Sequence, residues 1–333
     1  MSEIAGYLAR VIVLPAGIGA FLFVLPLVLG ERARLGRFAL AGTAFALVAT
    51  LAIEIGAPAL VRSLPAGLGE AWGDPSLAPE RWHQVAFVAA GVLLAAILAM
   101  PSGRRAFASR VVVAIAALAA AAMIAWIVEF PGEDSRRGIE ELAGTLVAIV
   151  GMRVLSRTDV RRPSGPGGFG GTIFLWVVAA LLAILAAFLM LVPFPSLAVA
   201  AGSAAGAASL MAIAAAVVTR RTGRPVVDGS GFAAVGFATI LATLAFAGLA
   251  YGREKVPEGL WLAALAAPWA GVLVTPIARA CVHASASIAW RLIATAALPL
   301  AVGAPHLARE FLPSEPGPAE PASSDPMDGI YGS

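Results

Sequence analysis

The segment TIFLWVVAALLAILAAFLMLV, residues 172–192, contains no ionisable side chain. A helix crosses the roughly 30 Å hydrocarbon core of a bilayer in about 20 residues. The apolar residues of this segment form a continuous run without the period of an amphipathic helix or strand, so they predict a membrane span. Comparable runs occupy nine further segments: 8–30, 38–61, 85–100, 111–130, 139–155, 197–219, 232–251, 260–280 and 287–305.

The composition supports the same fold class. The chain has 333 residues, of which 60% are hydrophobic and 13% charged, whereas soluble domains carry roughly 25% charged residues. This excludes an ordinary soluble globular protein. We expect an all-α, polytopic integral membrane helix bundle of about ten transmembrane helices, with 8 to 12 as the range, and no soluble domain. The first apolar run is expected to be retained, because no basic segment precedes it and no cleavage site of the A-x-A type follows before Glu31.

Arginine placement predicts the orientation of the bundle. Short cytoplasmic loops are enriched in Lys and Arg, and most arginines fall on alternate connections between the expected spans. These are residues 32, 34, 37, 104, 105, 110, 153, 157, 161, 162, 220, 221, 224, 279 and 291. We therefore expect ten spans with both termini outside the cytoplasm, in what is best interpreted as a bacterial cytoplasmic (inner) membrane.

The expected domain organisation is simple. Residues 1–308 form the membrane domain, and a Gly-, Pro- and Arg-rich cytoplasmic linker at 156–171 separates halves 1–155 and 172–308. Five spans per half would allow an inverted repeat, an arrangement common in secondary transporters, although no residue match between the halves supports it. Residues 309–333 have the acidic, Pro-rich composition of a disordered tail.

Glu54 is the acidic residue whose position topology does not explain. Charged residues within spans are costly and face protein or a water-filled cavity. At helical spacing Thr43, Thr50 and Glu54 share one face, and Pro58 one turn later predicts a helix break that frees backbone carbonyls. One interpretation is a solute or ion pathway in which Glu54 binds a cation or exchanges a proton. The alternative is a structural role, in which Glu54 accepts a hydrogen bond or pairs with an arginine such as Arg10.

Basic residues near the expected span ends are candidates for charge partners, or for contacts with anions or lipid headgroups. Arg10 lies near the outer end of the first span, where a long side chain can reach the interface. Arg279, His283 and Arg291 recur every four residues, or a multiple of four, around the ninth and tenth spans. Interface anchoring of these arginines is the simpler interpretation.

The motifs of catalysis and of cofactor binding are absent from the sequence. Cys281 is the single cysteine, which excludes a disulfide or a cysteine-ligated iron–sulfur cluster within one chain. The glycines of residues 165–170 match G-x-G-x-x-G but fall between membrane spans and not in a βαβ unit. We expect no catalytic residues, no metal, no cofactor and no nucleic-acid partner. The expected partners are the lipid bilayer and proteins that contact the outer loops and the tail.

Two functions are compatible with these features. The first is a permease or transporter of a small solute or ion, with Glu54, Thr50 and Thr43 along its pathway. The second is a non-catalytic membrane scaffold or assembly subunit of a larger complex, suggested by the missing catalytic motifs and the acidic tail. An enzyme is the least supported class, because no nucleophile and base lie on matching helices.

Overall fold

The computed structural model describes residues 2–29, 35–56, 84–98, 135–160, 172–192, 195–222, 231–252, 256–276 and 284–311. The regular secondary structure within these ranges is entirely helical. In chain order the helices are α1 (Ser2–Leu8), the π-helical turn η1 (Ala9–Val13), α2 (Leu14–Val28), α3 (Leu35–Ile55), α6 (Gln84–Leu98), α8 (Ser135–Val160), α9 (Thr172–Leu189), α10 (Pro195–Thr222), α11 (Gly231–Gly252), α12 (Glu258–Leu273) and α14 (Ala284–Phe311).

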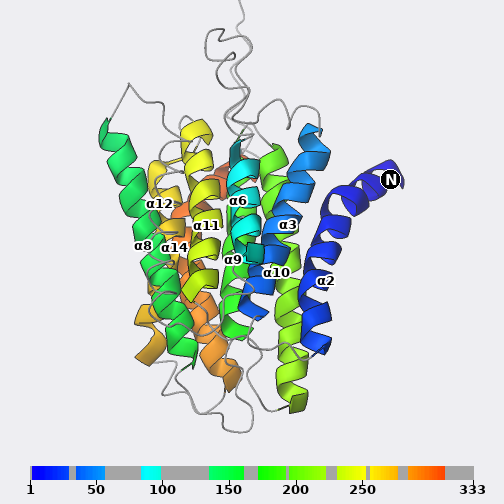
Figure 1. Ribbon diagram of the computed structural model, residues 1–333. Helices are drawn as coiled ribbons and strands as arrows, with labels where there is room; N and C mark the ends of the chain where they lie inside the picture. Colours follow the sequence, from blue (N-terminus) through cyan, green and yellow to red (C-terminus); the bar gives the residue numbers. More distant parts are fainter. Residues whose placement is uncertain are drawn as a thin grey trace, which may run out of the picture.

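The long helices stand side by side in one bundle (Figure 1). α11 is the most enclosed of the candidate spans, since 89% of its apolar window is buried, against 44% for the N-terminal helix formed by α1, η1 and α2. The N-terminal helix lies at one edge of the bundle, against α3 and α10, and its first residues lean away from the other helices (Figure 1). A helix that is apolar on every side, as α11 is, belongs in the interior of a bundle or in lipid.

Five of the described helices have the length and hydropathy to cross a membrane: Ile4–Val28, Leu35–Ile55, Thr172–Leu189, Pro195–Thr222 and Phe232–Ala250. Shorter apolar helices occupy Val85–Ile97, Glu258–Leu273 and Ala289–Pro305. The outward face of α2 is apolar and exposed at residues such as Ile18, Phe21 and Leu25, as contact with lipid requires. The chain is therefore an all-α protein with the helices of a membrane-embedded bundle.

A count of ten spans does not follow from these helices. The expected span 111–130 lies outside the described residues. The expected span 139–155 is helical within α8, but Glu140, Glu141 and Arg153 interrupt its apolar sequence, and α8 is not among the helices apolar enough to qualify.

Two helix ends differ from the sequence-based boundaries. α3 ends at Ile55, six residues before the expected end of the second span, because Gly56 adopts a left-handed conformation with φ 84°. Glycine takes this conformation without steric cost and commonly terminates helices, with proline shortly after it, as Pro58 is here. Likewise, α12 ends at Leu273, short of the expected residue 280.

Parts of the expected domain organisation lie outside the described residues. α8 extends through the first five residues of the expected linker 156–171, to Val160, and α14 continues through Phe311 into the expected tail. The remainder of the linker, including the glycines at 165–170, and residues 312–333 are not described. The division into two halves stays a prediction.

Small residues allow α2, α3 and α10 to pack closely. A Cβ atom placed on Gly19 of α2 would collide with the backbone carbonyl oxygen of Gly42 on α3, and a Cβ on Gly42 would collide with that of Gly19. A Cβ on Gly206 of α10 would meet the Ala16 side chain at 3.4 Å. Association of helices in a bilayer depends on this kind of close backbone approach, since burial from lipid supplies little hydrophobic driving force.

Substituting Gly19 by alanine should separate α2 from α3. The backbone of Gly42 cannot move aside as a side chain can, so we expect a loss of about 1–3 kcal/mol, as is usual for overpacking. Gly17→Ala is the matched control on the same helix, because a Cβ there meets no atom within 4 Å. Thermal unfolding of the purified protein in detergent would show a lower midpoint for Gly19→Ala alone; equal midpoints would contradict the close crossing.

Candidate functional site

Proline explains the irregular turn in the N-terminal helix. Pro15 has no N–H, so the carbonyl of Val11, four residues earlier, lacks its α-helical donor. The amide of Leu14 bonds to the Ala9 carbonyl five residues back, the spacing of the π-turn η1. Such turns often occur at functional sites, and the carbonyls that they release need other donors within a membrane.

Hydroxyl groups from two other helices supply those donors. Thr50 Oγ1 on α3 donates to the Val11 carbonyl oxygen at 2.9 Å, and Ser203 Oγ on α10 donates to the Ile12 carbonyl oxygen at 3.3 Å. Both side chains are buried, at 0% exposure. The carbonyls of Val11 and Ile12 thus tie the N-terminal helix to both of its neighbours.

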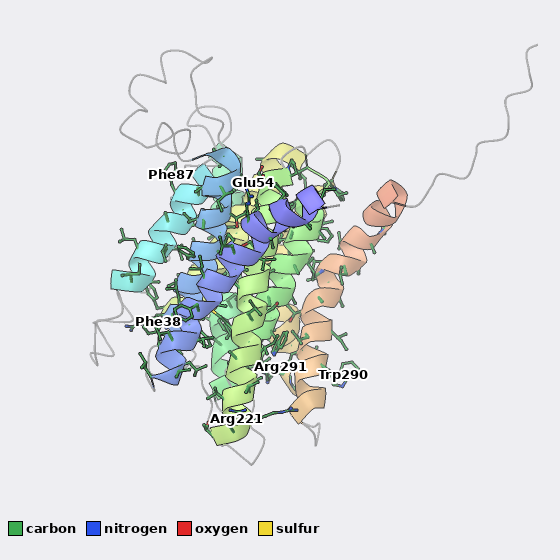
Figure 2. All side chains as sticks on the ribbon, turned by 90° about the vertical axis from the view of Figure 1, so that its right-hand side faces the viewer. Phe38, Glu54, Phe87, Arg221, Trp290 and Arg291 are labelled. Carbon is green, nitrogen blue, oxygen red and sulfur yellow. The ribbon has the colours of Figure 1, made fainter. Side chains whose placement is uncertain are left out.

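Glu54 joins the same three elements nearer the end of the bundle where the chain begins (Figure 2). The Tyr7 hydroxyl of α1 donates to Glu54 Oε1, and Ser196 Oγ of α10 donates to Glu54 Oε2 at 3.1 Å. Glu54 lies in the last turn of α3 and Ser196 in the first turn of α10. Glu54 and Ser196 are half-buried and Tyr7 is 46% exposed.

These groups lie along the contact of the same three helices and are here named the polar seam. It consists of the side chains of Tyr7, Glu54, Ser196, Thr50 and Ser203 and the carbonyls of Val11 and Ile12. Thr43 lies on α3 eleven residues before Glu54, or about 16 Å further along the helix at 1.5 Å per residue. Thr43 is fully buried and donates to the Ala39 carbonyl of its own helix at 2.9 Å, so the seam does not bond to it.

The interhelical bonds distinguish the seam from other buried hydroxyl groups. Thr239, Thr243, Thr275 and Thr295 each donate to the carbonyl four residues earlier on the same helix. A hydroxyl satisfied in this way needs no neighbouring helix. Thr50 and Ser203 instead donate to carbonyls of another helix, and both of those carbonyls belong to η1.

The described partners of Glu54 are neutral groups. Its two hydrogen bonds come from hydroxyls, and no ion pair joins it to another described residue. Arg10 lies on η1, one turn from Tyr7, but is exposed and makes no bond to Glu54. Of the two structural roles expected from the sequence, the hydrogen-bonded one is present here, and the pairing with Arg10 is not.

The other basic candidates lie apart from the seam. Arg279 and His283 fall outside the described residues. Arg291 on α14 is 3% exposed and lies toward the opposite end of the bundle from Glu54, beside the half-exposed Trp290 (Figure 2). Arg291 is therefore not a partner of Glu54, and contact with anions or lipid headgroups stays a prediction for it.

Several polar residues of the structure were not anticipated from the sequence. Ser196 and Ser203 of α10 and Tyr7 of α1 are not among the candidates predicted from the sequence. Pro15 was the available signal for the seam, since a proline identifies the carbonyl four residues earlier as unsatisfied. Glu141 is a buried carboxyl group, at 6% exposure, on α8, a helix that packs against α11 and α12.

Comparison with known proteins gives no further guide to the site, because no family model, curated protein or solved structure matches this chain.

The chemistry available at the seam is that of oxygen atoms. One carboxyl group, four hydroxyls and two backbone carbonyls all offer hard oxygen ligands, which suit protons and hard cations. The residues of the described ranges contain no cluster of three or more His, Cys, Asp or Glu side chains that could hold a metal ion.

Removing the hydroxyl of Thr50 should destabilise the protein more than removing that of Thr43. Thr50→Val leaves the buried Val11 carbonyl without a donor, at an expected cost of about 1 kcal/mol, near the upper part of the range measured for interhelical bonds in membranes. Thr43→Val, the matched control, loses only a bond within its own helix. Unfolding curves in mixed detergent micelles would measure both. Equal stabilities would show that Thr50 does not support η1.

Proposed function

We propose that the protein is a permease or transporter of a small solute or ion, and that the polar seam is part of its pathway. The observation that carries this proposal is a carboxyl group that, among the described residues, is bonded by neutral hydroxyls of two other helices. Further hydroxyl-to-carbonyl bonds join the same three helices deeper in the bundle. Ionisable residues of membrane-spanning helices that face other helices are commonly functional.

The position of Glu54 supports a role at the mouth of the pathway. It lies at the end of α3 beside the half-exposed Tyr7, so a solute or ion can approach it from water. Thr50 and the Val11 carbonyl follow about one helical turn further in. Thr43 is proposed to line the pathway at greater depth. Its hydroxyl hydrogen is donated to the Ala39 carbonyl, so its oxygen would act there as an acceptor.

The orientation inferred from the arginines places this mouth outside the cytoplasm. Ten spans, both termini outside and a bacterial inner membrane are the arrangement that we propose, on the basis of positive charges enriched on cytoplasmic loops. The exposed Arg221 at the far end of α10 (Figure 2) agrees with an inner boundary there.

The alternative function is a membrane subunit of a larger complex. In that case the hydrogen bonds of Glu54 would only fix the N-terminal helix against α3 and α10, and the protein would bind partners through its outer loops and tail.

A flux assay would test the proposed function. The protein, reconstituted in liposomes, would be exposed to concentration jumps of Na⁺, K⁺, H⁺, amino acids, sugars and organic cations while charge movement is recorded. We expect one class to produce a current that Glu54→Gln reduces at least about tenfold, the effect of losing roughly 1.4 kcal/mol of interaction. Electroneutral transport would be followed with radiolabelled solutes.

Glu258→Gln is the matched control, because Glu258 is an exposed carboxylate in the first turn of α12 and lies away from the seam. It should retain the wild-type flux. No flux for any probe, together with a partner protein that co-purifies in fixed stoichiometry, would favour the subunit function instead. Full flux in folded Glu54→Gln would exclude Glu54 from the pathway.

A further inference from the structure

We infer that the Tyr7–Glu54–Ser196 cluster is a binding site for one monovalent cation, with Na⁺ as its occupant. The inference rests on the proposed function for its role in transport. The binding itself follows from the hydrogen bonds, charge and exposure of the cluster and can be measured without any flux.

Two hydroxyl groups surround the carboxyl group of Glu54. Both carboxyl oxygens accept a bond, Oε1 from Tyr7 and Oε2 from Ser196. An ionised carboxylate can accept both bonds at once. In that form Glu54 presents one negative charge beside two neutral hydroxyl groups.

No described side chain neutralises this charge. Arg10 is the nearest cation along the sequence on the same helix as Tyr7, but it is exposed and forms no ion pair with Glu54. Tyr7 is the other ionisable group of the cluster, and it is neutral while its hydroxyl donates to Glu54. A cation bound from solution would supply the missing charge.

The ligands indicate the kind of cation. Carboxylate and hydroxyl oxygens are hard ligands and favour hard ions. Ca²⁺ sites use six to eight oxygens with more than one carboxylate in typical cases, and Mg²⁺ is bound by carboxylates together with several waters. One carboxylate with two neutral hydroxyls balances a single positive charge, which selects a monovalent ion.

The exposure of the cluster completes the site. Tyr7 is 46% exposed and Glu54 and Ser196 are half-buried, so the cluster is not enclosed by the described part of the chain, and we infer that water fills the remaining ligand positions of the cation. The hydroxyl oxygens that bond to Glu54 keep lone pairs and can turn them toward an ion. Further in, the Val11 carbonyl, which Pro15 deprives of its helical donor, lies beside Thr50.

Thermal unfolding of the purified full chain in detergent would test the inference. At pH 8 and constant ionic strength, NaCl would replace N-methyl-D-glucamine chloride in steps, with LiCl, KCl and CaCl₂ as comparison salts. We expect Na⁺ to raise the unfolding midpoint in a saturable way, since a ligand that binds only the folded state stabilises it. Calorimetric titration with NaCl should give the same dissociation constant.

Three variants make the site specific. Glu54→Gln should abolish the Na⁺ shift, and Ser196→Ala should weaken Na⁺ binding about tenfold, corresponding to the loss of one ligand. Tyr7→Phe keeps the ring and removes only the hydroxyl, so it should weaken Na⁺ binding about as much as Ser196→Ala does. It tests the site even where Glu54→Gln does not fold. Glu258→Gln, the exposed control, should bind Na⁺ as the wild type does.

The outcomes separate this inference from the proposed function. A midpoint that responds to pH but not to Na⁺ would overturn the cation site in favour of a proton alone. An equal response to Na⁺ in Glu54→Gln, or a stronger response to Ca²⁺ that depends on Glu54, would overturn it as well. Saturable Na⁺ binding without flux of any probe would support the site and contradict transport, whereas flux without Na⁺ binding would do the opposite.

Discussion

The polar seam depends on the requirement that backbone groups within a membrane bundle find hydrogen-bond partners inside the protein. Pro15 removes the donor that the Val11 carbonyl would otherwise have, and the π-turn shifts the neighbouring bonds by one residue. Thr50 and Ser203 then bond to the carbonyls of η1 from two different helices. The register of α3 and α10 against the N-terminal helix is set by these bonds, and that register places Glu54 beside Tyr7 and Ser196.

The N-terminal helix contacts α3 and α10 in two different ways along its length. Toward the far end, Gly19 and Gly42 bring the backbones of α2 and α3 into contact, and no water or side chain fits between them. Toward the end where the chain begins, the helices are joined by hydroxyls and carbonyls. Backbone contact resists separation through packing, while hydrogen bonds can be exchanged for bonds to water or to an ion. The interface is therefore held by backbone packing at one end and by exchangeable hydrogen bonds at the other.

The position of Glu54 alters the energetic argument made from the sequence. An expected span of 38–61 would bury the carboxylate about two turns below the surface, where it would be costly. Because α3 ends at Ile55 and Gly56 turns away from the helix, Glu54 instead lies in the last helical turn and is partly exposed. The cost that applies to a carboxylate deep in the membrane therefore does not apply at this position.

The amino-acid sequence alone determined the all-helical membrane class and the positions of most helices, because a run of about 20 apolar residues has few other stable forms. It also determined that Thr43, Thr50 and Glu54 share a helix face, since this follows from helical periodicity. The tertiary structure decided which hydroxyls bond across helices, because Tyr7, Ser196 and Ser203 are distant from Glu54 and Thr50 in the chain and meet only through packing. It also decided that Arg291 lies far from Glu54. A proline identifies an unsatisfied carbonyl from sequence, but the helix that satisfies it is chosen by the fold.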